Sequence, residues 1–275
     1  MATAVVVTFA TPFLDVGWIP DDAPIVVVHN DDQLDRSGLT RAEILHLEPG
    51  NNIGFGAAVN LALEHVTTAR IVLCNPDVSL TTDHWKALVD AEPDEVVTVP
   101  LVDAMGQLTS VVSRYPTPIS HLASAYRLGR FAPRGGHVRR VATQTLGAWG
   151  RAHRESLATP VGTWPLSERW VSGGVLSVDT ARLRAVGGFD PNYFLYYEDV
   201  DVCERLADAF PDTRAVVADV AAGDHQVGGS ALGHPERTRV ERDRRASAAR
   251  YARSRSGAGW SACATLLRPR VGRSA

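Results

Sequence analysis

The sequence lacks a long apolar segment and is poor in cysteine, and each absence excludes a class of protein. It contains no run of about 18 apolar residues, so no segment is predicted to span a membrane. The apolar residues 4–10 have no basic lead-in and are rich in β-branched side chains, which predicts a first strand and not a signal peptide. The scattered cysteines Cys74, Cys203 and Cys263 suit neither a disulfide framework nor a zinc site. We therefore expect a cytoplasmic protein.

The charge of the chain is distributed unevenly. At 275 residues there is room for one large α/β domain, or for one domain with an appendage. The formal net charge is only −3, but residues 234–275 carry eleven arginines against Glu236, Glu241 and Asp243. An acidic body with a basic tail is information about partners and not about the fold.

Short β-branched runs bounded by turn residues predict buried strands along the chain. They lie at residues 5–9, 25–28, 44–47, 71–74, 96–100 and 215–220. Helical patterns stand between several of them, at residues 57–66, 85–91, 180–186 and 200–209. This order of strands and helices fits an α/β domain. Residues 119–169 have two weak helical patches and give no clear assignment.

Polar residues follow two of the predicted strands. Pro76 fixes a turn after residues 71–74 and presents Asp77 at the carboxyl edge, where open α/β sheets bind ligands. The same sequence, Asn-Pro-Asp, is also an ordinary turn. His29 ends the second strand, where a neutral imidazole could accept a hydrogen bond from a pyrimidine ring, or could serve only as a strand end.

A glycine-rich turn opens the first predicted helix, with the sequence NNIGFGAAVN at residues 51–60. Glycines before a helix let the backbone approach a ligand closely and direct free N–H groups at phosphates. Taken alone, this pattern could also be a tight strand-to-helix turn.

The most informative stretch is residues 170–206. An apolar run is interrupted at residues 172–174, and Asp179 is predicted to cap a short helix that stops at the glycines 187–188. An aromatic loop at residues 189–197 then leads to Glu198 and Asp199. These acids could be only the charged first turn of a helix. Aromatic neighbours would screen them from water, however, and a screened carboxylate can act as a general base.

Two aspartates in this helix compete for that role. Asp199 and Asp201 are two positions apart, so on a helix they point about 200° away from each other. Asp201 has the i, i+4 spacing to Arg205 of an intrahelical ion pair. We therefore assign Asp201 to structure and Asp199 to chemistry.

The ordered string of motifs resembles family 2 glycosyltransferases, in particular their rhamnosyltransferase-like branch. That signature runs Gly-Gly-Phe-Asp, an aromatic loop, and Glu-Asp-x-Asp-x-x-x-Arg, which matches residues 187–190, 194–197 and 198–205 here. The segments at 51–60, 75–77, 103–106 and 114–118 resemble the same branch. The resemblance covers most of residues 5–230, patchily in the middle.

This resemblance implies a single GT-A-like (Rossmann-like) α/β domain with a mostly parallel central sheet at residues 1–232. Its nucleotide-sugar half would be about residues 1–100 and its acceptor half about 101–232, with a basic helical tail at 233–275. It implies an inverting transfer of a sugar, rhamnose being the first candidate, from a dTDP- or UDP-sugar. The acceptor would be a hydroxyl of a glycan, lipid-linked or small-molecule compound, and nucleic acid is not an expected partner.

The resemblance also implies roles for individual residues. Asp199 would be the general base, with Glu198 beside it. Mg²⁺ or Mn²⁺ would be held by Asp77 and by His225, which lies 26 positions after Asp199. The implied donor-binding residues are Thr8, His29, Asn52, Gly54, Asn60, Asn75 and Asp77. The implied acceptor-binding residues are Trp170, Gly173, Gly174 and Tyr197.

Three departures from the family pattern keep other functions open. His29 and Asn75 stand where the family usually has acids, and the connection at residues 11–24 is short. A non-catalytic sugar-nucleotide-binding or scaffold protein is therefore a serious alternative. A sugar-phosphate nucleotidyltransferase is a weak one, because residues 8–12 offer no glycine-rich basic loop.

The basic tail also allows two interpretations. It could be a solvated helix, predicted at residues 236–255, that packs on the edge of the domain. It could instead be drawn to an anionic membrane surface or a lipid-linked acceptor, which would place the protein peripherally at the inner face of the membrane. In either case we expect that removing the tail leaves the donor chemistry intact.

Overall fold

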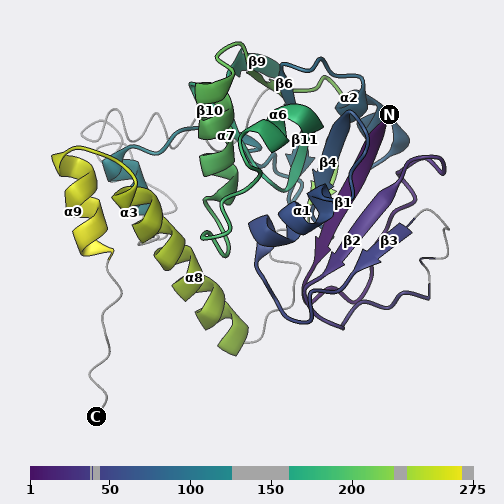
Figure 1. The fold of residues 1–275 in the computed structure, drawn as a ribbon, viewed down its shortest axis with the longest axis horizontal. Coiled ribbons are helices and arrows are strands. Elements are labelled where there is room, and N and C mark those ends of the chain that lie inside the picture. Colours follow the sequence, from purple (N-terminus) through teal and green to yellow (C-terminus); the bar gives the residue numbers. More distant parts are fainter. Residues whose placement is uncertain (38, 40–43, 126–160, 226–233, 268–275) are drawn as a thin grey trace.

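A computed structural model describes residues 1–37, 39, 44–125, 161–225 and 234–267 of the chain. Its centre is an eight-stranded sheet in the order β3-β2-β1-β4-β11-β6-β12-β9 (Figure 1). These strands are β3 (Ile44–Leu47), β2 (Ile25–His29), β1 (Ala2–Thr8), β4 (Arg70–Cys74), β11 (Val175–Asp179), β6 (Glu95–Thr98), β12 (Arg214–Val217) and β9 (Gly162–Pro165).

The sheet is mostly parallel. β3, β2, β1 and β4 pair in parallel, as do β6 and β12, whereas β11 and β9 run antiparallel to their neighbours. Every residue of β1, β2 and β4 is buried, which is typical of parallel strands covered on both faces. The predicted fold class, an α/β domain around a mostly parallel sheet, is confirmed.

Helices cover this sheet where the sequence supplies caps and stops. They are α1 (Phe55–Leu63), α2 (Thr82–Val89), α6 (Thr180–Ala185) and α7 (Glu198–Ala209). The predicted cap of α6 is present, because the Asp179 carboxylate accepts a hydrogen bond of 2.8 Å from the Arg182 backbone N–H. Gly187 and Gly188 then adopt positive φ angles of 79° and 69°, which ends the helix.

The chain changes sheets at residues 172–174, where the sequence interrupts its apolar run. Before them, β10 (Arg169–Val171) pairs with β8 (Val112–Arg114), and after them β11 enters the main sheet. A third small sheet joins β5 (Val78–Ser79), β13 (Gly223–His225) and β7 (Leu101–Val102). In this sheet His225 of β13 pairs with Val78, so His225 lies beside Asp77 although the two are far apart in the sequence.

Residues of the predicted tail form two helices that pack on the rest of the molecule. α8 (His234–Arg253) and α9 (Ala258–Leu266) lie against each other and against α3 (Pro118–Ala125) (Figure 1). The buried residues of α8 include Ala248, Ala249 and Tyr251. This agrees with the packed-helix interpretation. The boundary predicted at 232–233 and most of the unassigned segment, residues 126–160, lie outside the described residues.

Membrane-spanning helices need length together with apolar character. Within the described parts of the chain, no helix is both long and apolar enough to cross a bilayer.

Candidate active site

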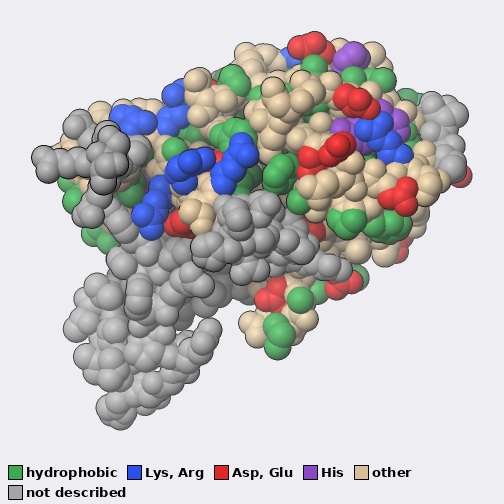
Figure 2. All heavy atoms as spheres, turned by 90° about the horizontal axis from the view of Figure 1, so that it is seen from below, with side chains coloured by type: hydrophobic (Ala, Val, Ile, Leu, Met, Phe, Trp, Pro, Cys, Tyr) green, Lys and Arg blue, Asp and Glu red, His purple; other side chains and the backbone are tan. Residues whose placement is uncertain are grey.

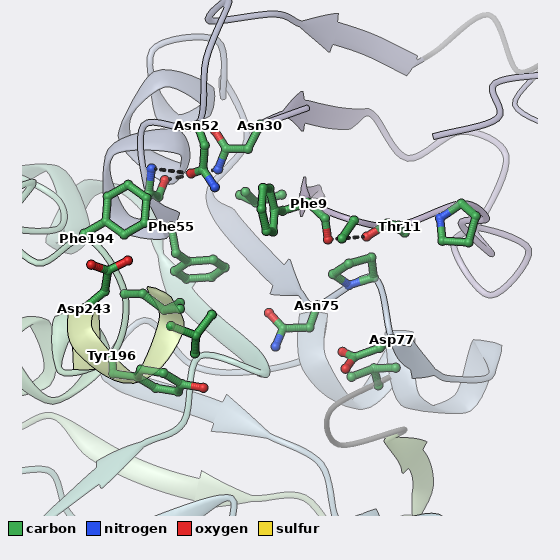
Figure 3. Close-up of a pocket in the computed structure, with 18 of the residues that line it drawn as sticks. Phe9, Thr11, Asn30, Asn52, Phe55, Asn75, Asp77, Phe194, Tyr196 and Asp243 are labelled. Atoms are coloured by element: carbon green, nitrogen blue, oxygen red, sulfur yellow. Dashed lines mark hydrogen bonds between the residues drawn. The ribbon is translucent and has the colours of Figure 1, made fainter. Parts of the chain in front are cut away.

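A cavity of about 590 Å³ lies at the carboxyl edge of the parallel strands. Phe9 and Thr11 enter it after β1, Asn30 after β2, and Asn75 and Asp77 after β4. Its wall also includes Phe13, Asp15, Asn52, Gly54, Phe55, Phe194, Leu195, Tyr196, Arg239, Val240 and Asp243. Figure 3 shows Asn75 and Asp77 on the opposite side of the cavity from Phe194 and Asp243. The position agrees with the general place of ligand sites in open α/β sheets.

Four predicted donor-binding residues line this cavity, namely Asn52, Gly54, Asn75 and Asp77. Two of them belong to the glycine-rich turn before α1. The Asn52 side-chain oxygen accepts a hydrogen bond of 2.9 Å from the Gly54 N–H, which shapes the turn. The structure therefore brings the glycine-rich turn and the Asn-Pro-Asp turn together, although they are far apart in the sequence.

Three other predicted donor-binding residues are not in the wall. Thr8 is fully buried, and its hydroxyl lies 3.4 Å from the Val28 carbonyl. The His29 ring stacks on His46 with a hydrogen bond of 2.9 Å between their ring nitrogens. Burial lowers the pKa of His29 to about 4, so its imidazole is neutral. Strand β2 extends one residue further than predicted, and this places His29 inside the sheet.

Asn60 also differs from its prediction. Its amide oxygen accepts 2.8 Å from the Phe189 N–H, and its amide nitrogen donates 2.7 Å to the Phe189 carbonyl. A Cβ on Gly188 would lie 2.3 Å from the Asn60 amide oxygen, so this approach requires glycine. Asn60 thus fastens the Gly-Gly-Phe turn to α1, and the family motif at this position has a structural role here.

Asn30 was not among the predicted site residues, although it is buried at the cavity beside the predicted His29. Its amide nitrogen donates 3.4 Å to the Gly54 carbonyl, and its amide oxygen accepts 3.3 Å from the Ile53 N–H. The available signal was the position of Asn30 directly after a predicted strand, next to the predicted His29.

The aromatic loop touches the glycine-rich turn directly. Gly54 has φ +85°, and a Cβ there would lie 2.5 Å from the Phe194 carbonyl oxygen. That oxygen accepts a hydrogen bond of 3.1 Å from the Phe55 N–H. Glycine is therefore required at position 54 both by its φ angle and by the close backbone. This contact joins the two halves of the chain at the cavity wall.

Glu198 and Asp199 begin α7 next to this wall. The Asp199 carboxylate accepts backbone hydrogen bonds of 3.1 Å from Gly173 and 2.9 Å from Val200. Glu198 is 6% exposed, and its Oε2 atom has no hydrogen-bond partner within the described structure. The acids do not line the cavity themselves. Phe55 does, and a Cβ on Gly173 would lie 3.5 Å from its ring and 3.6 Å from the Asp199 Cβ.

The two acids have unequal proton affinities. Burial, and then the charge of Asp199, raise the pKa of Glu198 well above its ordinary value. Burial also raises the pKa of Asp199, but the Gly173 and Val200 N–H groups oppose this shift by stabilising its anion. Of the two acids, Glu198 therefore holds its proton more strongly, and an ionised carboxylate beside a neutral carboxyl is an arrangement that suits a general base.

The predicted metal ligands Asp77 and His225 lie together. His225 Nε2 is 3.5 Å from Asp77 Oδ1, and both side chains are partly buried. No group of three or more His, Cys, Asp or Glu residues suited to a metal ion occurs in the described portion of the chain. One carboxylate and one imidazole nevertheless fit Mg²⁺ or Mn²⁺, which complete their coordination with phosphate oxygens and water.

Gly173 and Gly174, the two glycines predicted to bind an acceptor, lie between the acid pair and the predicted metal ligands. A Cβ on Gly174 would lie 3.6 Å from the His225 ring and 3.9 Å from the Asn75 amide nitrogen. The Gly174 carbonyl accepts 2.8 Å from the Asn75 N–H. The Gly173 N–H donates to the Asp199 carboxylate, so a segment of two glycines without side chains connects the acids with the strand edge.

The remaining predicted residues have structural contacts. Asp201 and Arg205 form the predicted ion pair at 2.8 Å. The Trp170 indole donates 3.2 Å to the Arg114 carbonyl, and the Tyr197 hydroxyl lies 3.1 Å from His121. Neither Trp170 nor Tyr197 is part of the cavity wall.

Comparison with known proteins confirms the resemblance found in the motifs. No protein-family model matches the chain. It is 31% identical over 181 residues to N-acetylglucosaminyl-diphospho-decaprenol L-rhamnosyltransferase of Mycobacterium tuberculosis, in two strains. The match covers 59% of this chain and 53% of the relative, so the chain spans about half the length of the curated relatives it matches.

Solved structures include distant likenesses. One is S. aureus TarS 1-349 in complex with UDP-GlcNAc, with a TM-score of 0.48 and 12% identity over 97% of this chain and 71% of that one. Another is the mannosyltransferase PcManGT from Pyrobaculum calidifontis with GDP-Man and Mn²⁺, with a TM-score of 0.45 and 13% identity over 96% and 78% of the two chains.

Proposed function

We propose that this protein is an inverting glycosyltransferase of the GT-A type. It transfers a sugar, with rhamnose as the first candidate, from a nucleoside diphosphate to an acceptor hydroxyl. The observation that carries the proposal is the unequal acid pair Glu198–Asp199 beside a strand-edge cavity. The identity to a curated rhamnosyltransferase supports the choice of reaction and sugar.

The cavity is the proposed donor site. Its volume of about 590 Å³ falls within the usual 300–1,000 Å³ of small-molecule sites. Phe9 offers an aromatic face, and Asn30 and Asn52 shape the glycine-rich turn. Asp77 and His225 would hold Mg²⁺ or Mn²⁺. A cation bound there neutralises the charge that builds on the leaving diphosphate.

Asp199 is the proposed general base. Its carboxylate takes the proton of the acceptor hydroxyl as that oxygen attacks C1 of the sugar, on the face opposite the departing diphosphate. The backbone N–H groups of Gly173 and Val200 hold the carboxylate in place and favour its ionised form before the transfer. Because Glu198 is neutral at that moment, it does not repel the anion.

The acceptor belongs to the same proposal. The curated relative is named for a lipid-linked diphosphate sugar, and we infer an acceptor of that class, with other glycans and small molecules as alternatives. Arg239, Arg242 and Arg245 of α8 have side chains more than half exposed. Figure 2 shows basic side chains gathered on one half of a face of the molecule, which suits peripheral contact with anionic lipid.

Transfer from dTDP-rhamnose and UDP-sugars, measured with and without Mn²⁺, tests the proposal. Asp199→Asn should reduce turnover by about 10²–10⁴ and leave donor affinity nearly unchanged, because only the proton acceptor is lost. Asp77→Ala should abolish the Mn²⁺-dependent part of donor binding. Asp201→Asn is the matched control, and should lower activity only in proportion to the folded fraction.

The outcomes separate the alternatives. Near-normal turnover in Asp199→Asn would reject Asp199 as the base and make Glu198 the next candidate. Donor binding by the unmodified protein without turnover of any sugar nucleotide would instead favour a non-catalytic binding protein.

A further inference from the structure

The backbone immediately before the acid pair is unusual. Tyr196 and Tyr197 have φ angles of +67° and +72°, the left-handed region that L side chains rarely adopt. Tyr197 is also the N-cap residue of α7, so the next two side chains are Glu198 and Asp199. A backbone of this kind persists only where surrounding contacts determine it.

One contact is a chain of hydrogen bonds through a buried histidine. His121 Nε2 lies 2.9 Å from the Ala248 carbonyl, and His121 Nδ1 lies 3.1 Å from the Tyr197 hydroxyl. A carbonyl only accepts, so Nε2 carries the proton and Nδ1 accepts from Tyr197. His121 is 1% exposed, and burial lowers its pKa to about 4, which keeps the ring neutral and able to accept. This series of hydrogen bonds joins α3, the aromatic loop and α8.

A second contact is an aromatic cluster, formed by His121, Tyr197, Tyr251 and Trp260. The Tyr197 ring centroid lies 5.2 Å from that of His121 and 5.1 Å from that of Tyr251. Trp260 of α9 lies 5.3 Å from His121 and 5.7 Å from Tyr251. Aromatic pairs at such separations stabilise beyond their buried area. Residues of α3, α8 and α9 therefore form one cluster with the side chain of Tyr197.

Helix α8 also binds the loop at earlier positions. Arg250 pairs with Asp190 at 2.8 Å, and its guanidinium lies 5.4 Å from the centre of the Tyr193 ring. The Ser247 hydroxyl donates 2.9 Å to the Leu195 carbonyl. The loop is thus held along its length by one helix, which runs beside it in Figure 1.

We propose that Tyr197 and His121 are positioning residues for Asp199, and that α8 supplies the support on which they depend. The inference rests on the proposed function for its catalytic consequence. Loss of the Tyr197–His121 hydrogen bond would free the left-handed turn, and Asp199 would lose its place against Gly173. Misplacement of a catalytic group by about 1 Å can cost about 10²-fold in rate. The expectation that the tail can be removed without effect on the chemistry is therefore revised.

Tyr197→Phe is the main test, because it keeps the ring contacts and removes only the hydroxyl. We expect kcat to fall about tenfold, and the donor KM to change less than twofold. Amide hydrogen exchange should become faster in residues 193–200. Tyr115→Phe is the matched control: it also removes a tyrosine hydroxyl, in this case one that donates 2.9 Å to the Leu166 carbonyl, but Tyr115 lies outside the loop and the cavity.

Two histidine variants add a rescue. A glutamine at position 121 offers an acceptor for Tyr197 and a donor for Ala248, whereas leucine offers neither. His121→Gln should therefore retain more of kcat than His121→Leu. If His121→Leu does not fold, Tyr197→Phe decides the question.

The two proposals fail separately. Wild-type kcat or wild-type exchange in Tyr197→Phe would overturn the positioning role. If the unmodified protein transfers no sugar at all, the proposed function fails, and the exchange measurement alone decides whether α8 and His121 hold the loop.

Discussion

Replacing Glu198 by glutamine tests whether this buried carboxyl keeps its proton beside Asp199. Glu198 is 6% exposed, lies next to the charge of Asp199, and has one oxygen without a partner in the described structure. Glutamine has nearly the shape of a protonated glutamate and cannot ionise. If Glu198 is neutral, this variant removes a titration and changes little else.

The expected effect follows from proton linkage. The pKa of Glu198 is raised on folding, so its contribution to stability is fully present below the ordinary carboxyl pKa of 4.5. As pH rises from there toward the raised pKa, the unfolded chain releases a proton that the folded chain retains. The free energy of unfolding of the wild type then falls by about 1.4 kcal/mol per pH unit from this group. Glu198→Gln lacks that loss, so its stability relative to wild type should increase with pH at this slope.

Urea unfolding of both proteins between pH 5 and pH 8 measures the difference. Glu64→Gln, at an exposed position, is the control for losing a carboxylate without burial. The acid limb of the kcat profile should remain in Glu198→Gln, because Asp199 ionises while Glu198 is still neutral. Parallel stability curves for wild type and Glu198→Gln would show that Glu198 is ionised or hydrated, and would refute this account of the acid pair.

Two further predictions concern the cavity wall and α8. Gly50 and Gly54 both have positive φ angles, but only Gly54 touches the Phe194 carbonyl, so Gly50→Ala should cost about 1–2 kcal/mol of strain. Gly54→Ala should cost about 1–3 kcal/mol more than Gly50→Ala, measured by thermal unfolding, because its Cβ would clash with the loop. It should also weaken donor binding, measured by calorimetry. Equal effects of the two variants on stability and binding would contradict the loop contact. Arg242→Ser, at a side chain 74% exposed, should weaken binding to vesicles of anionic phospholipid about fivefold at low salt, since one basic residue near such a surface is worth about 1 kcal/mol. Arg36→Ser is the control at a distant exposed site, and equal binding by both variants would leave α8 with a structural role only.

Local patterns in the sequence predicted the structure correctly where the structure of a segment depends on that segment alone. The Asp179 cap and the Asp201–Arg205 pair depend only on spacing within a helix, and both are present as predicted. His29 shows the opposite case. Strand β2 continues through it, and because side chains alternate along a strand, one residue decides which side chain reaches the cavity. The residue at which a strand ends is the least certain part of a prediction from sequence.

A packed helix was one of the two predictions for α8, but the residues that it contacts could not be predicted from periodicity. Its buried residues include Ala248, Ala249 and Ala252, which give no stripe of large apolar side chains. What binds this helix is contributed from elsewhere in the chain: His121 from α3, and Asp190 from the start of the aromatic loop. Each contact crosses more than 50 sequence positions, so the sequence predicted a helix at the edge of the domain but not the side chains that hold it there.

The charges around the cavity explain why a cation belongs to the proposed mechanism. Among the described residues of its wall, the acids are Asp15, Asp77 and Asp243, and the basic side chain is Arg239. Arg239 lies 3.9 Å from Asp243, so these two largely offset each other. A donor diphosphate would then meet an excess of negative charge near Asp77. Asn75 stands where the family usually has an acid, and it lowers this excess of negative charge by one. A divalent ion held by Asp77 would offset the negative charge that remains. The single carboxylate at this strand edge is thus compatible with metal-assisted transfer, because Asp77 and His225 would hold the ion and phosphate oxygens would supply further ligands.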